Sequence, residues 1–173
     1  MTTEELKRYI ADVPDFPQPG ILFRDITPLL ADPAALGAAI DALAERGREL
    51  APDLVAGIES RGFLFGLPLA QRLGTGFVPV RKPGKLPRET VRESYTLEYG
   101  ENTIEMHADA VRPGQRVLVV DDLLATGGTA AAAGNLVRRA GGEVAGWLFL
   151  VELAPLRGRE KLVGAPVHSV LVY

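Results

Sequence analysis

The sequence predicts an α/β protein with a doubly wound, mainly parallel sheet flanked by helices. Short runs of β-forming residues recur along the chain, helical patterns lie between several of them, and polar turns follow two of the runs directly. One run, residues 117–120, reads VLVV and is too apolar for a half-exposed strand. It is typical of a central strand that is covered on both faces. We therefore expect a ligand site at the carboxyl end of this strand.

Helix and strand patterns alternate over most of the chain. The predicted helices cover residues 2–10, 32–50, 63–73 and about 130–140, and the predicted strands cover residues 54–58, 77–80, 117–120, 144–151 and 167–172. A capping-box pattern opens the first helix, and Asp32-Pro33 is a typical helix start. Pro68 is expected to kink the third helix. Gly141 and Gly142 end the last one.

Three further segments interrupt this alternation. Residues 15–30 contain three prolines and a glycine beside apolar residues, which predicts an irregular N-terminal hood over a site or, more simply, a surface loop packed on the core. Residues 81–92 combine basic residues with proline and glycine, which predicts a mobile loop that orders on an anionic ligand or is merely solvated. Alternating apolar residues on both sides of residues 100–102 predict a flexible β-hairpin, the flap.

Composition excludes several classes of protein. The 173 residues fit a single domain, residues 1–173. The net charge of −3 argues against sequence-independent binding of nucleic acid or of an anionic membrane surface, so the expected ligand is small. The absence of cysteine excludes disulfides, thiolate catalysis and cysteine-ligated zinc. The charged start of the chain and the lack of any apolar run of about 18 residues predict a cytoplasmic protein.

The strongest motif follows the central strand. Two adjacent acids, Asp121 and Asp122, precede a turn of small residues that consists of Ala125, Thr126, Gly127, Gly128 and Thr129. Glycines let backbone N–H groups approach an anion, threonines add hydroxyl donors, and a helix start adds partial positive charge, so we expect a phosphate cradle that is neither a Walker loop nor GxGxxG. Because carboxylates repel phosphate, the acid pair indicates a ribose diol. A tight strand-to-helix turn would explain the glycines but not the acids.

Several segments, in a fixed order, resemble the adenine phosphoribosyltransferase family of type I phosphoribosyltransferases. They are FPQPGILFRDITPLL, ESRGFLFGLPLAQ, VRKPGKLP, SYTLEYG, VVDDLLATGGT and VELAPLRGREKL, and they cover nearly the full length. The resemblance implies the type I phosphoribosyltransferase fold and a cytoplasmic homodimer of purine salvage. It implies transfer of ribose 5-phosphate from phosphoribosyl pyrophosphate (PRPP) to adenine, which yields AMP and pyrophosphate with Mg²⁺ as cofactor.

By this resemblance the motif residues bind PRPP. Residues 125–129 hold the 5-phosphate, Asp121 and Asp122 face the ribose hydroxyls, and Ser60, Arg61 and Gly62 form the pyrophosphate loop. Glu59 stands where the family commonly has aspartate, so its role is left open. Departure of pyrophosphate leaves an oxocarbenium-like ribose, which requires cations at the leaving group and anions beneath the sugar. The acid pair supplies the anions, and the cations expected to help are Arg61, Arg81, Lys82 and Lys85.

The resemblance also places the base. Leu22, Phe23 and Arg24 match adenine-contacting positions, partly through their backbone, and Leu153 matches the opposite apolar wall. Glu98, on the flap, is the candidate acceptor for the proton that adenine loses when its ring nitrogen attacks the ribose. From the sequence alone, a solvent-facing glutamate in an alternating strand is nearly as good an interpretation of Glu98. No protein ligands are expected for Mg²⁺, since PRPP oxygens and water can hold it.

Two alternatives remain. The first is a PRPP-sensing regulator of the same fold, which would need a winged helix or a basic face that this acidic chain of 173 residues does not provide. The second is a phosphoribosyltransferase for xanthine, hypoxanthine or a pyrimidine. The choice of base depends on the hood, which is readable only through the resemblance.

Overall fold

A five-stranded parallel sheet lies at the centre of the molecule. The structure, a computed structural model, describes residues 1–97 and 100–173. The sheet has the order β4-β3-β7-β8-β9, and every neighbouring pair is parallel. Its strands are β3 (Leu54–Ile58), β4 (Gly76–Val80), β7 (Arg116–Leu124), β8 (Glu143–Glu152) and β9 (Val167–Val172). From β3 the chain winds outward to β4, and from β7 it winds the other way, so the switch point of this doubly wound sheet lies between β3 and β7.

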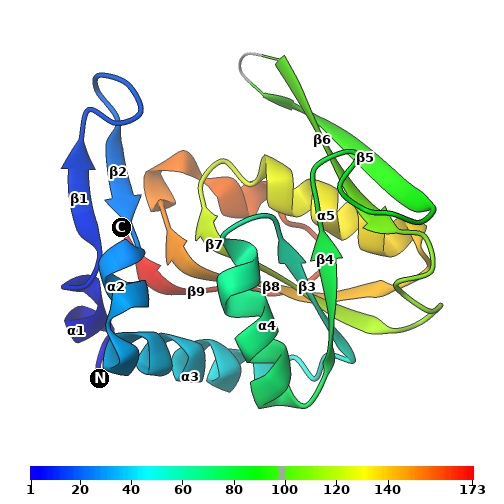
Figure 1. The fold of residues 1–173 in the computed structure, drawn as a ribbon, viewed down its shortest axis with the longest axis horizontal. Coiled ribbons are helices and arrows are strands. Elements are labelled where there is room, and N and C mark those ends of the chain that lie inside the picture. Colours follow the sequence, from blue (N-terminus) through cyan, green and yellow to red (C-terminus); the bar gives the residue numbers. More distant parts are fainter. Residues whose placement is uncertain (98–99) are drawn as a thin grey trace.

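Helices cover both faces of the sheet (Figure 1). Helices α3 (Pro33–Glu49) and α4 (Gly62–Leu73) pack on one face, and α5 (Gly128–Arg139) packs on the other. The predicted start of α3 is confirmed, because the Asp32 side chain accepts a hydrogen bond from the backbone N–H of Ala35 at 2.8 Å. The α/β class expected from the sequence is therefore confirmed.

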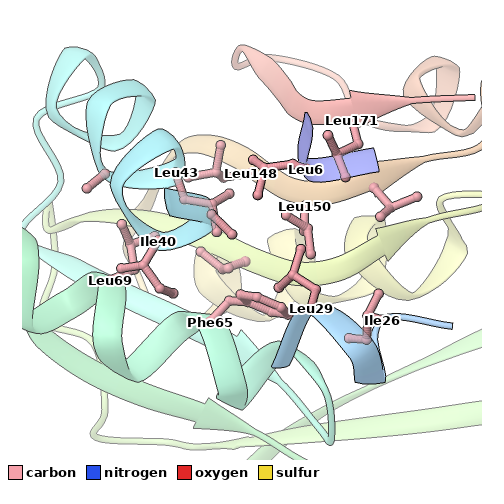
Figure 2. Packing of buried hydrophobic residues seen from close by; sticks show 14 of the residues in the cluster. Leu6, Ile26, Leu29, Ile40, Leu43, Phe65, Leu69, Leu148, Leu150 and Leu171 are labelled. Carbon is pink, nitrogen blue, oxygen red and sulfur yellow. The ribbon is translucent and has the colours of Figure 1, made fainter. Parts of the chain in front are cut away.

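The hydrophobic core is divided by the sheet into two clusters. Strand β8 shows the division, because Leu148 and Leu150 belong to one cluster while Trp147 and Phe149 belong to the other. This alternation follows from the two-residue period of a strand that is buried on both faces. Figure 2 shows the first cluster, where side chains of β8 meet side chains from the helices of that face, such as Leu43.

The hood is more regular than expected. It consists of α1 (Thr3–Lys7), β1 (Ala11–Pro14), β2 (Leu22–Asp25) and α2 (Thr27–Ala31). Strands β1 and β2 pair antiparallel, from Ala11 opposite Asp25 to Pro14 opposite Leu22. The prediction of an irregular segment over residues 15–30 was wrong for β2 and α2, because two of its three prolines, Pro17 and Pro19, lie in the connection between the strands and leave the backbone of β2 free to pair.

The predicted flap is a β-hairpin on the α5 side of the sheet (Figure 1). Its strands are β5 (Thr90–Leu97) and β6 (Gly100–His107), which pair from Thr90 opposite His107 to Leu97 opposite Gly100. Within residues 1–97 and 100–173, none of the helices combines the length and apolar character needed to cross a membrane.

The basic segment that precedes the flap is anchored on β6. Arg81 exchanges two backbone hydrogen bonds with Glu105, at 2.9 and 2.7 Å. The buried Glu105 carboxylate also accepts from the Gly84 N–H at 3.2 Å and pairs with Arg92 at 2.8 Å. Arg88 pairs with Asp109. Glu105 and Asp109 both lie outside residues 81–92, so the composition of that segment could not indicate them as partners.

Candidate active site

A polar cavity of about 620 Å³ opens at the switch point between β3 and β7. Its walls come from the carboxyl ends of both strands, from the basic segment and from the flap. The lining residues that the sequence assigned to PRPP are Ser60, Arg61, Lys82, Asp121, Asp122 and Thr129. Glu59, whose role was left open, also lines the cavity, as do Tyr95 and Asn102. Residues far apart in the sequence therefore meet at the predicted edge of the sheet.

The acid pair lies inside β7 and not after its end. Strand β7 continues to Leu124 because its pairing with β8 continues, whereas its pairing with β3 stops at Val120. Asp121 and Asp122 thus occupy a stretch of strand with one unpaired edge, and both line the polar cavity. The expected strand, residues 117–120, was too short because a single-sequence pattern does not show that one neighbour ends before the other.

Burial makes these carboxyls hard to ionise. Asp122 is 5% exposed and forms an ion pair with Arg61, with 2.7 Å between Arg61 Nε and Asp122 Oδ2. Its backbone N–H donates to Oδ1 of Asp121 at 2.9 Å. Burial, reinforced by the neighbouring Asp122, raises the pKa of Asp121 well above its usual range. Burial also raises the pKa of Asp122, although Arg61 opposes this rise.

The turn after β7 leads directly into α5, as the sequence predicted. Gly127 adopts φ +80°, and α5 begins at Gly128, with the Ala131 N–H donating to the Gly127 carbonyl at 3.0 Å. A Cβ at Gly127 would overlap the carbonyl oxygen of Gly158, and a Cβ at Gly158 would overlap the carbonyl oxygen of Ala125. The cradle therefore lies in direct backbone contact with a second glycine loop.

Gly158 is a structural contact that the sequence did not indicate. Gly158 is the first residue of the short 3-10 helix η2 (Gly158–Lys161). This helix follows β8 and another 3-10 helix, η1 (Ala154–Leu156). Arg159 holds this loop by donating twice to the buried carboxylate of Glu152, at 2.6 Å from both Nε and Nη2. Burial acts to raise the pKa of Glu152, but the Arg159 fork outweighs it and lowers this pKa overall. The only sequence signal was glycine in the polar loop after a strand.

Glu59 pairs with a cation expected to contact pyrophosphate. Its carboxylate accepts from Nε and Nη2 of Arg81, each at 3.1 Å, and from the Lys82 N–H at 2.9 Å. The Arg81 fork lowers the pKa of Glu59, so this pair is ionised. Of the four predicted cations, Arg61 and Lys82 line the polar cavity, whereas Arg81 and Lys85 do not. The Lys85 carbonyl accepts from Arg81 at 3.3 Å.

An apolar cavity of about 570 Å³ adjoins the polar one under the hood. Phe23, Ile26 and Leu64 are among its lining residues, and Asp25 is its carboxylate. Arg61 lines both cavities, and its guanidinium carbon lies 5.7 Å from the centre of the Phe23 ring. Arg61 therefore separates a polar compartment from an apolar one.

The four residues matched to adenine do not share one cavity. Strand alternation turns Phe23 toward the apolar cavity, whereas Leu22 and Arg24 line another cavity of about 550 Å³ together with Leu153. Arg24 lies 4.1 Å above the Tyr173 ring and pairs with Asp12. The predicted proton acceptor, Glu98, lies outside the described residues.

Three comparisons with known proteins agree with this geometry. The family model of the phosphoribosyl transferase domain matches residues 25–163. The chain is 62% identical over 167 residues to the adenine phosphoribosyltransferase of Thermobifida fusca, covering 95% of this chain and 94% of that one.

Solved structures give the same result. The adenine phosphoribosyltransferase of Thermoanaerobacter pseudethanolicus superimposes with a TM-score of 0.96 at 54% identity, over 99% of this chain and all of that one. The enzyme of Saccharomyces cerevisiae, complexed with an imino-altritol bisphosphate and adenine, gives a TM-score of 0.92 at 45% identity, with 98% of each chain covered.

Proposed function

The chain belongs to the family of the phosphoribosyl transferase domain, and from this premise we propose that it transfers ribose 5-phosphate from PRPP to adenine. The products are AMP and pyrophosphate, and the reaction salvages a purine base. The relatives of the same length that carry this activity in their names support the assignment.

One observation carries the proposal: Arg61 lines both the polar and the apolar cavity. A transferase that joins a sugar phosphate to a flat apolar base needs one compartment for each, with the reacting atoms at their border. The polar compartment has the hydroxyls of Ser60 and Thr129 for phosphate and carboxylates for a diol, and residues 125–129 line a smaller cavity of about 80 Å³ that shares Asp121 and Thr129 with it. The apolar compartment has the Phe23 ring, which suits an aromatic base.

In this proposal the acid pair stabilises the ribose as pyrophosphate departs. Asp122 is already paired with Arg61, whereas Asp121 accepts the Asp122 N–H at Oδ1 and can accept further hydrogen bonds. Ribose hydroxyls that donate to Asp121, and positive charge that develops on the sugar, both favour its ionised form. Arg61 and Lys82 neutralise the leaving pyrophosphate from the cavity wall, while Glu59 keeps Arg81 and the Lys82 backbone in place.

On the basis of the family resemblance, we propose that Glu98 accepts the proton that adenine loses. Tyr95, three residues earlier in the sequence, lines the polar cavity. The Glu98→Gln variant should lose roughly 10²–10⁴-fold in kcat if a general base is removed. An unchanged kcat would leave Glu98 as an ordinary strand residue.

Mg²⁺ fits the donor set of the polar cavity. Hard oxygen ligands suit this ion, which retains water and is commonly held through one or two carboxylates and substrate phosphates. Glu59, Glu101, Asp121 and Asp122 are the carboxylates that line the cavity, and the adjacent Asp121 and Asp122 would help to hold an ion bound mainly by PRPP oxygens and water. When bound, Mg²⁺ supplies positive charge to the leaving pyrophosphate.

We also propose, from the resemblance, that the protein acts as a homodimer in the cytoplasm. Light scattering on the purified chain would test the dimer, because a monomeric mass would contradict it.

Radiolabelled bases offered singly with PRPP and Mg²⁺ test the main proposal. Adenine should give AMP. Hypoxanthine should react at least about tenfold more slowly than adenine, because its 6-oxo group would leave a buried polar group of the hood unpaired. Equal turnover of hypoxanthine, or turnover of xanthine or a pyrimidine in place of adenine, would contradict the assignment of the base.

A further inference from the structure

A hydroxyl of the flap contacts the phosphate cradle directly. Tyr95, on β5, places its hydroxyl 2.8 Å from Oγ1 of Thr129, in the first turn of α5. Both residues line the polar cavity. Thr129 is one of the two cradle threonines, so this hydrogen bond joins the flap to a group that we have assigned to the 5-phosphate.

The Tyr95 ring also explains why position 128 of the cradle carries no side chain. A Cβ at Gly128 would lie 3.3 Å from Cδ2 of this ring, which is tighter than ordinary contact. The ring itself is partly buried and packs against the second core cluster. A small residue at position 128 therefore makes room for the flap as well as for an anion.

A second contact fixes the position of β5 along α5. Glu93 lies two residues before Tyr95 and so on the same face of the strand. Its carboxylate accepts from Asn135 Nδ2 at 3.0 Å and pairs with Arg139 Nη2 at 3.0 Å. Arg139 also donates to the Arg92 carbonyl at 2.6 Å. Because these contacts hold β5 at Glu93, they also place the Tyr95 hydroxyl beside the cradle.

We propose that Tyr95 is a positioning residue that couples the flap to an occupied phosphate cradle. The proposal rests on the assignment of residues 125–129 to the 5-phosphate. Each hydroxyl has one proton to donate. With phosphate bound, Thr129 donates to a phosphate oxygen and accepts from Tyr95, so the two hydrogen bonds point the same way and strengthen each other. Phosphate binding thereby holds the flap over the cavity, and the flap holds Thr129 toward phosphate.

Calorimetry with ribose 5-phosphate and with inorganic pyrophosphate tests this coupling. Tyr95→Phe keeps the ring and removes the hydroxyl, so ribose 5-phosphate should bind roughly 3- to 10-fold more weakly while pyrophosphate binds as before. A purely structural role for Tyr95 would weaken both ligands together or lower the melting temperature. Ser94→Ala is the matched control, because among the described residues the Ser94 hydroxyl bonds across the flap, to Thr103 at 2.7 Å, and not to the cradle.

A double-mutant cycle makes the test sharper. In a Thr129→Val background, Tyr95→Phe should have no further effect on ribose 5-phosphate. The same weakening in both backgrounds, or unchanged affinity of the Tyr95→Phe variant, would overturn the coupling. A wild-type protein that binds no ribose 5-phosphate would overturn it too, together with the cradle. A wild-type protein that binds ribose 5-phosphate but makes no AMP would refute only the proposed function.

Discussion

The polar cavity is held by the sheet and by backbone contacts, whereas the apolar cavity is covered by a hood of short elements. On the polar side, β7 supplies the buried Asp122 and the half-buried Asp121, and Gly158 lies against the cradle. On the apolar side, β1 and β2 have only four residues each, and Phe16 and Leu22 are about half exposed. The polar side should therefore tolerate few substitutions, and the hood should tolerate more.

The largest expected effect is on the chemical step, and it sharpens this contrast. Asp121→Asn and Asp122→Asn should each lower the single-turnover rate by roughly 10²–10³-fold, because an electrostatic contact with the developing positive charge is lost. Adenine affinity should change little. Asp12→Asn, which removes a carboxylate of the hood, is the matched control and should leave the rate near that of the wild type. Rates near wild type in both acid variants would make the acids structural.

A smaller effect should follow when the backbone contact behind the cradle is disturbed. Gly158→Ala places a methyl group on the Ala125 carbonyl, and such overpacking costs about 1–3 kcal/mol. If the cradle absorbs this strain, ribose 5-phosphate should bind roughly 10- to 100-fold more weakly in calorimetry. Gly37→Ala, in an open position of α3, should not weaken binding. Normal ribose 5-phosphate affinity in Gly158→Ala would mean that the loop around Gly158 moves and that the cradle keeps its geometry.

The smallest effect concerns stability and its pH dependence. The pKa of Asp121 in the folded protein is raised above its unfolded value of about 3.8, so between these two values the folded state binds more protons and the free energy of unfolding falls as pH rises. Asp121→Asn removes this penalty. Its melting temperature at pH 7 should exceed that of the wild type by roughly 2–4 °C per kcal/mol gained.

Lowering the pH should narrow this difference until it disappears below about pH 4. Thermal melts of both proteins across this range, without ligand, provide the measurement. An Asp121→Asn variant that is less stable than the wild type at pH 7 would show that the carboxylate stabilises the free protein.

The two sides also differ in how far the sequence predicted them. The strand VLVV and the small residues that follow it are local patterns, so the sheet centre and the turn into a helix were expected correctly. That this turn binds phosphate stays a prediction. The contact of Gly158 with the cradle and the pairing of Glu59 with Arg81 join distant segments, and no local pattern reports them. In the hood, the family resemblance named neighbouring residues, but strand alternation sends Phe23 and Leu22 into different cavities.

The position of β7 between β3 and β8 has a consequence for how the chain folds. Leu54 pairs with Val117, so the centre of the sheet cannot close until the whole flap has been synthesised. The flap pairs residues close in sequence, and local contacts form faster than distant ones. We therefore expect the hairpin to form early and the ligand edge to form among the last steps. PRPP can then stabilise the finished protein but cannot assist the early stages of its folding.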